Sequence, residues 1–346
     1  MEIIRVGVDL AKNVFELYGV DKHDRPVWRV SLRRARWLQE LQRRVAPGAE
    51  IGMEACAGAH HWGRQLRARG YRVKLMAPQF VKPYVKSNKS DRNDAAAICE
   101  AMSRPSMRFV ELKSVEQQDI QAVHRVRAEL IKQRTGKANQ IRGLAGEYGL
   151  VAPVRIGPLR HALPEWLEEA RNGLSDRFRR VLAGLAEDLR RLDERIKELD
   201  EEIASIVREL PAAQRLLALR GVGPTIATAL VAALGSGESF ARGREFAVAM
   251  GLTPKHRGTG GKERILGISK RGDAYLRQLL VHGARAAVRT ARGKVDPLSR
   301  WINGLLAHKH SNVVTVALAN KTARLAWALI RHDVDYDPAL AANRAQ

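Results

Sequence analysis

The chain is short of acidic residues relative to basic ones. Its 37 Asp and Glu residues stand against 60 Lys and Arg residues, which gives a formal net charge of +23 at pH 7. Such an excess of cations indicates a polyanionic partner, because Lys and Arg gain affinity by releasing counterions from phosphates. No apolar run approaches the roughly 18 residues of a membrane-spanning helix, and the N-terminus lacks a signal-peptide pattern. We therefore expect a nucleic acid, and no membrane, as the partner.

Cysteine is almost absent. The chain has two, Cys56 and Cys99, both in apolar segments and neither at a spacing typical of metal ligands. The histidine pairs at 60/61 and 308/310 also lack matching ligand partners. These absences exclude a disulfide framework and the usual zinc sites, and they indicate a reduced, cytoplasmic protein.

Four of the scarce acids stand in an informative order. Asp9 follows the apolar run IIRVGV, Glu54 follows EIGM, and Asp91 and Asp94 lie in SDRNDA. Singly, each has an ordinary explanation: a polar residue at a strand end, or an acid in the first turn of a helix. As an ordered set they are typical of a nuclease site that holds two Mg²⁺ ions about 4 Å apart on carboxylate oxygens. We favour this metal-site interpretation.

Residues 1–112 alternate between strand and helix patterns. Strands are predicted at 3–9, 14–20, 27–32, 50–56 and 71–77, and helices at 35–45, 60–70 and 94–102. The first three strands are expected to form an antiparallel meander. This order predicts an α/β domain of RNase H/RuvC-like fold, in which all four acids reach one end of the sheet.

Residues 113–210 are rich in charged helical sequence. One helix is predicted over 115–148 and a second over 178–210, joined by a Pro-containing connecting loop or helical turn at 149–166. Apolar residues of the second helix alternate steps of three and four for more than four heptads, from Phe178 through Leu182, Leu185 and Leu189 to Leu210. This predicts a coiled coil, either folded back on the first helix or between protomers. The basic first helix fits a nucleic-acid surface and a solvated helix face equally well.

Residues 211–335 are predicted to form a mainly α domain, followed by a tail at 336–346. LLALRGVGPTIATALVAALG resembles a helix-hairpin-helix, in which amides at Gly221 and Gly223 hold a phosphate, although a plain helical hairpin fits nearly as well. A glycine-rich loop around Thr259 follows. It collects candidate phosphate-binding residues, namely Lys255, His256, Arg257, Lys262, Arg264, Lys270 and Arg271.

The motifs together resemble those of the DEDD transposases of the IS110 insertion-sequence family, and within it the IS1111 subgroup. The resemblance rests on VGVDLAKNVF, MEACAGAHHW, KSNKSDRNDAAAICEA, AVHRVRAELIKQRTGKANQIRGL, LRGVGPTIATAL and GLTPKHRGTGGKERILGISKRGD, in the family order over nearly the whole chain. It implies a RuvC-like domain, a coiled coil and a C-terminal transposase domain. It also implies a bacterial recombinase that acts on donor and target DNA and is directed by a structured non-coding guide RNA.

The resemblance also assigns residues. It implies that Asp9, Glu54, Asp91 and Asp94 bind Mg²⁺, and that a hydroxyl residue forms a covalent link to DNA in a homodimer or homotetramer. Related members include a pilin-gene invertase, so inversion stays open. Lys12, three residues after Asp9, is interpreted either as a contact to the scissile phosphate or as a solvated turn lysine.

One position departs from the family, because its nucleophile is serine and the aligned residue is Thr259. Three interpretations follow: Thr259 is the nucleophile despite its crowding β-branch, Ser269 replaces it, or the copy is impaired. We favour Thr259, and we expect Ser269 to be a helix cap. Two other functions use the same features: a RuvC-like nuclease in which water attacks, and a non-catalytic scaffold for RNA and DNA.

Overall fold

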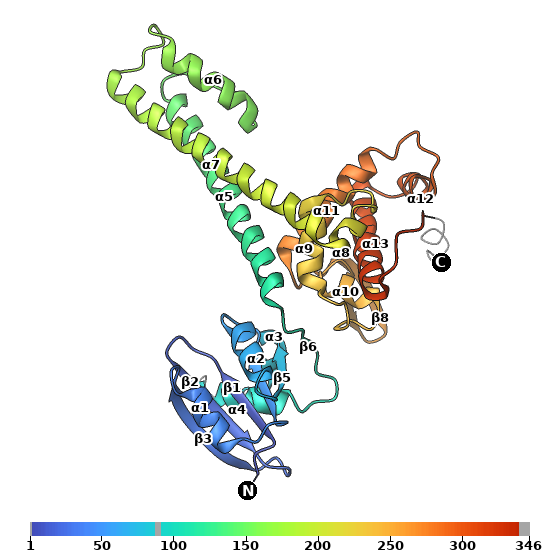
Figure 1. Cartoon of the computed structure of the whole chain (residues 1–346). Coiled ribbons are helices and arrows are strands. Elements are labelled where there is room, and N and C mark those ends of the chain that lie inside the picture. Colours follow the sequence, from blue (N-terminus) through green and yellow to red (C-terminus); the bar gives the residue numbers. More distant parts are fainter. Residues whose placement is uncertain (1, 87–90, 339–346) are drawn as a thin grey trace. The chain divides into compact units, whose positions relative to one another are not determined.

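The computed structural model describes residues 2–86 and 91–338. The chain forms two compact units, Met1–Glu116 and Gln117–Gln346, and each is presented by itself. Within the described residues, the first is a mixed α/β unit and the second is helical apart from one hairpin (Figure 1). The finer division at 112, 210 and 335 stays a prediction.

The first unit is built on a six-stranded sheet within the described residues. Its spatial order is β3-β2-β1-β4-β5-β6. The strands are β1 (Arg5–Asp9), β2 (Val14–Val20), β3 (Pro26–Arg33), β4 (Glu50–Glu54), β5 (Arg72–Met76) and β6 (Phe109–Val110). The first three form the predicted antiparallel meander, whereas β1, β4 and β5 are parallel. The short antiparallel β6 was not predicted.

Helices cover both faces of this sheet. On one face, α1 (Trp37–Arg44) and α2 (Ala59–Arg67) bury a core that includes Val6, Val8 and Ile51. On the other, α4 (Asp91–Ala101) packs with α3 (Pro78–Val81) and the 3₁₀ helix η1 (Lys82–Tyr84). The predicted helices at 35–45, 60–70 and 94–102 are confirmed, while α3 and η1 were missed. The sheet therefore lies between two helical layers.

Helix α4 lies directly on the sheet because the strands beneath it carry glycines. A Cβ added at Gly7 of β1 would stand 2.2 Å from the carbonyl oxygen of Ala95 and 2.6 Å from the amide nitrogen of Cys99. A Cβ at Gly52 of β4 would stand 2.4 Å from Sδ of Met102. A side chain at Gly7 would lift the helix away from β1, whereas a side chain at Gly52 would require the Met102 side chain to move.

The second unit begins with an antiparallel pair of long helices, α5 (Val115–Gly146) and α7 (Asp176–Glu209) (Figure 1). Ion pairs fix their opposite directions: Arg127–Asp200 at 2.5 Å, Arg134–Asp193 at 3.2 Å and Lys137–Asp188 at 3.0 Å. Three cations of α5 are therefore engaged by acids of α7, which reduces the basic surface that the sequence suggested for this helix.

The segment between these helices is not the predicted loop or single turn. It holds α6 (Ile156–Glu168), a 13-residue helix that contains Pro164. Pro158 stands in its first turn, where a backbone N–H has no helical partner, so this proline is tolerated. Leu159 and Leu163 are buried against the end of α7. Tertiary packing thus offsets the hydrogen bond that Pro164 removes.

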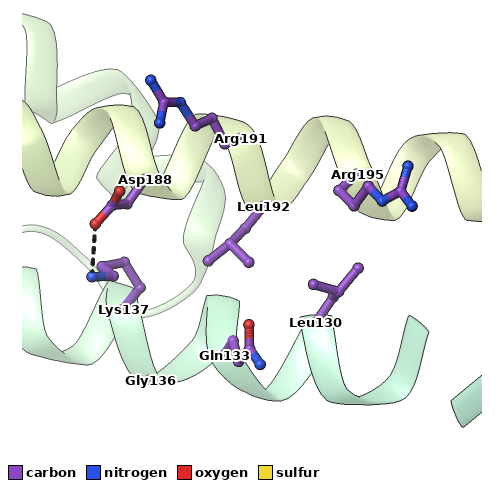
Figure 2. A pocket seen from close by; sticks show the side chains of 8 residues that line it. All are labelled: Leu130, Gln133, Gly136, Lys137, Asp188, Arg191, Leu192 and Arg195. Atoms are coloured by element: carbon purple, nitrogen blue, oxygen red, sulfur yellow. Dashed lines mark hydrogen bonds and ion pairs between the residues drawn. The ribbon is translucent and has the colours of Figure 1, made fainter. Parts of the chain in front are cut away.

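The apolar seam of α7 is only partly covered. Phe178, Leu182, Leu189, Ile196 and Ile203 are buried, whereas the intervening Leu185, Leu192, Leu199 and Ile206 are half-buried. Beside Leu192 and Leu130, a groove of about 670 Å³ opens between α5 and α7 (Figure 2). The seam thus continues into an open apolar strip.

The remainder of the second unit is a helical bundle. Its helices are α8 (Pro211–Leu216), α9 (Pro224–Leu234), α10 (Gly243–Ala249), α11 (Ala274–Arg289), α12 (Pro297–Leu306) and α13 (Ser311–His332). Contrary to the sequence expectation, α13 is long and apolar enough to span a membrane by length and composition alone. A core helix passes the same test, and its Val314, Leu318 and Ala326 are buried in the core of this bundle.

A buried histidine links the antiparallel pair of α5 and α7, which we call the long arm, to this bundle. His124 of α5 is 3% exposed, and its Nδ1 and Nε2 lie 2.9 Å from the Tyr275 hydroxyl and the Thr228 hydroxyl respectively. The Thr228 hydroxyl donates to the Pro224 carbonyl, so Nε2–H is the donor to Thr228 and Nδ1 accepts from Tyr275. Burial, followed by the charge of Arg127, lowers the pKa of His124 to about 4.

We expect Gly7→Ala to destabilise the first unit by about 1–3 kcal/mol, because the new methyl group overlaps the α4 backbone. Hydrogen exchange of β1 and α4 peptides measures this loss locally. Gly136→Ala adds the same atom in open space on α5 and is expected to leave these peptides unchanged. Equal protection in Gly7→Ala and wild type would contradict the close contact.

Stability of the second unit is expected to fall between pH 6.5 and about 4. In this interval the unfolded chain protonates His124 and the folded chain does not, so lower pH favours unfolding, by up to roughly 3 kcal/mol. Urea unfolding at several pH values measures the slope. His124→Gln should flatten it, whereas His308→Gln, at an exposed position, should not. A slope that survives His124→Gln would refute this assignment.

Candidate nucleic-acid and metal site

Two of the predicted acids emerge side by side from the sheet. Asp9 ends β1 and Glu54 ends β4, and these parallel strands are paired through Val8 and Met53, one residue before each acid. Alternate residues of a strand share a face, so Asp9 lies on the face of Gly7. By the same rule Glu54 lies on the face of Gly52. Both acids therefore point to the side that α4 covers.

The start of α4 lies toward the same end of the sheet. Ala95 and Cys99 stand over Gly7. Burial raises the pKa of the Cys99 thiol, and the charges of Arg5 and Asp24, at the opposite end of β1 from Asp9, also act on this pKa. The helix thus runs against the direction of β1. Its first turn, which holds Asp94, consequently lies toward Asp9.

This geometry does not include the fourth acid, Asp91, or a complete metal site. Asp91 is the first residue of α4, and its side chain lies outside the described part of the structure. Within residues 2–86 and 91–338, no group of three or more His, Cys, Asp or Glu side chains is close enough to hold a metal ion. The four-acid metal site therefore stays a prediction, supported by the convergence of Asp9 and Glu54.

Electrostatics at this end of the sheet agree with two neighbouring carboxylates. Burial raises the pKa of the Cys56 thiol, and the negative charges of Glu54 and then Asp9 raise it further. Both carboxylates therefore act on one point just beyond β4. Lys12 is exposed in the turn between β1 and β2, a position compatible with either interpretation of this residue.

The predicted glycine-rich loop is instead a β-hairpin. Strand β7 (Pro254–Thr259) pairs with β8 (Lys262–Ile268) around Gly260 and Gly261, whose φ angles are +59° and +77°. Positive φ at both turn positions is typical of the type I′ turn that suits two-residue hairpins, and glycine adopts it without strain. The two-residue Gly-Gly connection between residues 254–259 and 262–268 was the sequence signal for this hairpin, which was missed.

One face of the hairpin gathers Thr259 with cations. Arg257 pairs with Arg264 across the strands and Thr259 pairs with Lys262, and all four residues are exposed. Directly paired residues share a face, as do residues two apart, so these four side chains lie together on what we call the basic face. Two arginines directly opposite each other repel. A bound phosphate would relieve that repulsion.

The other predicted basic residues lie in different places, two on the first strand of the hairpin and two after its second strand. Lys255 lies on β7 beside an irregularity in strand pairing, and His256 lies on the opposite face from Arg257, 4.0 Å from the carboxylate of Glu263. Lys270 and Arg271 follow the hairpin. A Cβ at Gly251 would meet the Arg271 carbonyl oxygen at 2.1 Å, so this segment is packed against the end of α10.

Ser269 is not the predicted helix cap. Helix α11 is capped by Asp273, whose carboxylate accepts from the Leu276 amide at 2.9 Å. The Ser269 amide instead donates to the Thr253 carbonyl at 2.8 Å, where the hairpin closes. Its hydroxyl accepts from the Arg271 amide at 3.5 Å. Ser269 therefore belongs to the base of the hairpin, and Thr259 to its tip.

The two glycines of the predicted helix-hairpin-helix differ. A Cβ at Gly221 would meet the backbone oxygen of Gly283 at 2.4 Å, so this glycine is explained by close packing on α11. Gly223 precedes α9 and has open space around it. Helix α8 is only six residues long. Phosphate binding at this turn stays a prediction, and the open geometry supports it at Gly223 alone.

Comparison with known proteins finds transposase families that match both the first unit and the C-terminal part of the chain. Residues 6–149 match a family of DEDD transposases of IS110 type, and residues 213–297 match the transposase family IS116/IS110/IS902. The chain is 48% identical, over 98% of its length and all of the relative, to a probable family 20 transposase of Pseudomonas aeruginosa. It is 42% identical to the transposase for insertion sequence element IS1111A of Coxiella burnetii, over 96% of this chain and 90% of the relative. It is 40% identical to that for IS1328 of Yersinia enterocolitica, over 94% and 96%.

We expect the double variant Arg257→Ala/Arg264→Ala to bind duplex DNA more weakly and with less salt dependence. If each arginine contacts one phosphate, the slope of log affinity against log salt should fall by about 1.8. Fluorescence anisotropy at several salt concentrations measures it. The control Arg190→Ala/Arg195→Ala removes two arginines that are already paired with acids of α7. Equal slopes for the hairpin variant and the wild type would rule out phosphate contacts by the basic face.

Proposed function

The chain belongs to the IS116/IS110/IS902 family of transposases, and we propose that it is an RNA-guided DNA recombinase of a bacterial insertion sequence. In this proposal Mg²⁺ held by acids of the first unit and a hydroxyl group of the second act on one phosphodiester. The observation that carries the chemical part is the convergence of Asp9 and Glu54 on the face covered by α4.

The donor set fits magnesium. Carboxylate oxygens are the ligands that this hard cation prefers, and Asp9 and Glu54 leave adjacent parallel strands toward the start of α4. Asp91 and Asp94 would complete the set from that helix. Bound Mg²⁺ would supply charge stabilisation at the reacting phosphate. The close packing of α4 over Gly7 and Gly52 would fix the distance between the acids on the strands and the acids on the helix.

Thr259 is the proposed nucleophile. Its exposed hydroxyl shares the basic face with Arg257, Lys262 and Arg264, whose charges would hold a phosphate beside it. The Thr259 oxygen would bond to phosphorus and give up its proton, while the bond from phosphorus to the leaving sugar oxygen breaks and that oxygen takes up a proton. The β-branch restricts χ1, which makes attack slower than from serine in the same place.

The reaction needs both units at one phosphate, from the same chain or from two chains. The partly covered seam of α7 favours an assembly of chains. Leu192 and Leu130 border an open groove, and Arg191 and Arg195 stand along its rim (Figure 2). A helix of a second chain would cover the half-buried positions of the seam. The expected assembly is a homodimer or homotetramer.

The guide RNA and the DNA substrates follow from the family resemblance and the charge of the chain. A net charge of +23 is ample for two nucleic acids. Guided recognition leaves target choice to base pairing, so no protein motif need encode the target sequence. Donor and target DNA, with action in the bacterial cytoplasm, complete the proposal. Site-specific inversion would use the same chemistry.

The second candidate function is a RuvC-like structure-selective nuclease. It would use the same acids with water as nucleophile and would not need Thr259. The gathering of Thr259 with three cations at a hairpin tip favours the recombinase over this nuclease. A non-catalytic scaffold would bind DNA and RNA without cleaving either.

The decisive experiment incubates the protein with its element's flanking non-coding RNA, labelled donor-end DNA and Mg²⁺. A denaturing gel then detects a protease-sensitive covalent adduct. We expect the adduct in wild type and in Ser269→Ala, none in Thr259→Ala or Asp9→Asn, and faster formation in Thr259→Ser. Ser269 is the matched control because it lies at the base of the same hairpin.

Two results would change the assignment. Cleavage without an adduct, still abolished by Asp9→Asn, would establish the nuclease. An adduct lost in Ser269→Ala and retained in Thr259→Ala would move the nucleophile to Ser269. Binding of DNA and RNA without cleavage under all conditions would indicate the non-catalytic scaffold.

A further inference from the structure

A groove in the first unit has no role in the chemistry described above. It has a volume of about 480 Å³ and runs along one flank of α4. Its α4 residues lie on one flank of the helix and are Asn93, Ala96, Ala97, Cys99 and Glu100, and Ser103 and Arg104 follow just beyond the end of α4. Residues of β1, β2, β3 and η1 form the opposite wall. We call this cavity the α4 groove.

Two aromatic rings in the α4 groove carry arginines over their faces. The guanidinium of Arg29 lies 4.6 Å from the ring centroid of Tyr18, and that of Arg104 lies 5.6 Å from the centroid of Tyr84. Aromatic rings and guanidinium planes are the surfaces on which unpaired nucleobases stack. Small residues, Ala96 and Ala97, leave room between them.

The charge of the α4 groove is positive. The described lining residues include four cations (Arg5, Arg29, Lys86 and Arg104) and two acids (Asp24 and Glu100). Asp24 accepts from Arg5 at 2.6 Å, and Glu100 is paired with both Lys86 at 2.8 Å and Arg104 at 2.6 Å. Glu100 therefore holds two cations at the rim, and its single negative charge neutralises only one of their two positive charges.

Arg29 is the cation best placed to accept a phosphate. It is exposed, and its guanidinium donates to the Tyr18 hydroxyl at 3.4 Å. That contact is long, so the Tyr18 ring orients the guanidinium more than it neutralises it. The arrangement combines an apolar floor, stacking surfaces and a cationic rim.

The α4 groove leads toward the candidate acids. One end is at Asn93, the residue before Asp94, and the other is at Arg104. The helical part of this span, from Asn93 to the end of α4 at Ala101, corresponds to about 12 Å, the length of about two nucleotides of an extended strand. A volume of about 480 Å³ is that of a small-ligand pocket and is far too small for a duplex.

We propose that the α4 groove binds an unpaired segment of nucleic acid and guides it to the acids at the start of α4. Bases would stack on the Tyr18–Arg29 and Tyr84–Arg104 pairs, and phosphates would contact Arg29 and Lys86. The binding stands on the α4 groove alone, whereas its purpose rests on the proposed function. The strand comes from DNA opened near the reacting phosphate or from an unpaired part of the RNA.

The test uses photo-crosslinking with the full-length Thr259→Ala protein in EDTA, so that neither cleavage nor adduct formation is needed. The probes are single-stranded oligonucleotides of about eight nucleotides, deoxy and ribo, each with one 4-thiopyrimidine. Mass spectrometry locates the crosslinked peptide. We expect crosslinks in peptides that contain Tyr18 or Tyr84, and weak competition by a duplex of the same sequence. A deoxy preference assigns the strand to DNA and a ribo preference assigns it to RNA.

Variants make the test specific. Tyr84→Ala should reduce crosslinking at the α4 groove about 5- to 10-fold, and Tyr84→Phe should retain it because the ring remains. Arg29→Ala should weaken it, whereas Arg43→Ala, which removes an exposed arginine on α1 across the sheet, should not. Ala96→Trp fills the α4 groove without removing a charge and should abolish crosslinking there.

Crosslinks confined to other segments, or yields unchanged by both Tyr84→Ala and Ala96→Trp, would overturn the proposal. Failure of the proposed function is distinguishable, because the Thr259 adduct and the crosslink are measured separately. A crosslink at the α4 groove without any adduct in the wild-type reaction would keep the groove and remove the recombinase chemistry.

Discussion

The first unit depends on how closely α4 approaches the sheet. Gly7 leaves no side chain between β1 and the helix, so the α4 backbone at Ala95 and Cys99 lies against the strand, and Gly52 leaves room for the side chains of Ile98 and Met102. This contact orients the first turn of α4 toward Asp9 and Glu54, and it also shapes the cavity along the flank of the same helix. One packing constraint thus organises both the acids and the adjoining groove.

The second unit is organised differently, with polar contacts that set the register of apolar surfaces. The ion pairs between α5 and α7 are partly exposed, and such pairs contribute little stability individually. Their value is in specifying which residues of the two helices face each other. The buried contacts of His124 with Thr228 and Tyr275 do the same where the arm meets the bundle. Tyr275 is also the second residue of α11, which follows the hairpin, so the arm and the hairpin base are attached to one helix.

Much of the fold was readable from the sequence, for identifiable reasons. Alternating and helical apolar patterns located five of the six strands of the large sheet and the helices α1, α2, α4, α5 and α7. Strand β6 has two residues and is too short for any pattern. Helix α6 was missed because Pro164 normally ends a helix, and only packing of Leu159 and Leu163 explains its survival. The cap of α11 was misassigned because local sequence did not reveal that Ser269 closes the hairpin.

The candidate site was predictable to a smaller extent. Strand ends are visible in a sequence, so Asp9 and Glu54 were located together correctly, and parallel pairing confirms their shared edge. The basic face was not foreseen, because which cations share a side with Thr259 depends on the register of the hairpin. The α4 groove was not foreseen either. Tyr18, Arg29 and Tyr84 belong to separate elements and meet only through tertiary packing.

The hairpin also has a thermodynamic consequence. Its two strands are exposed except at the half-buried Ile268, and an isolated two-stranded hairpin is marginally stable. The like charges of Arg257 and Arg264, which lie directly opposite each other, lower the stability of the hairpin further unless an anion lies between them. A ligand that binds only the paired form must strengthen the pairing by the same free energy that the pairing adds to its affinity. If the basic face binds nucleic acid as proposed, release of the nucleic acid would loosen the hairpin and loosening of the hairpin would promote release, so the charge pattern would favour turnover of the complex.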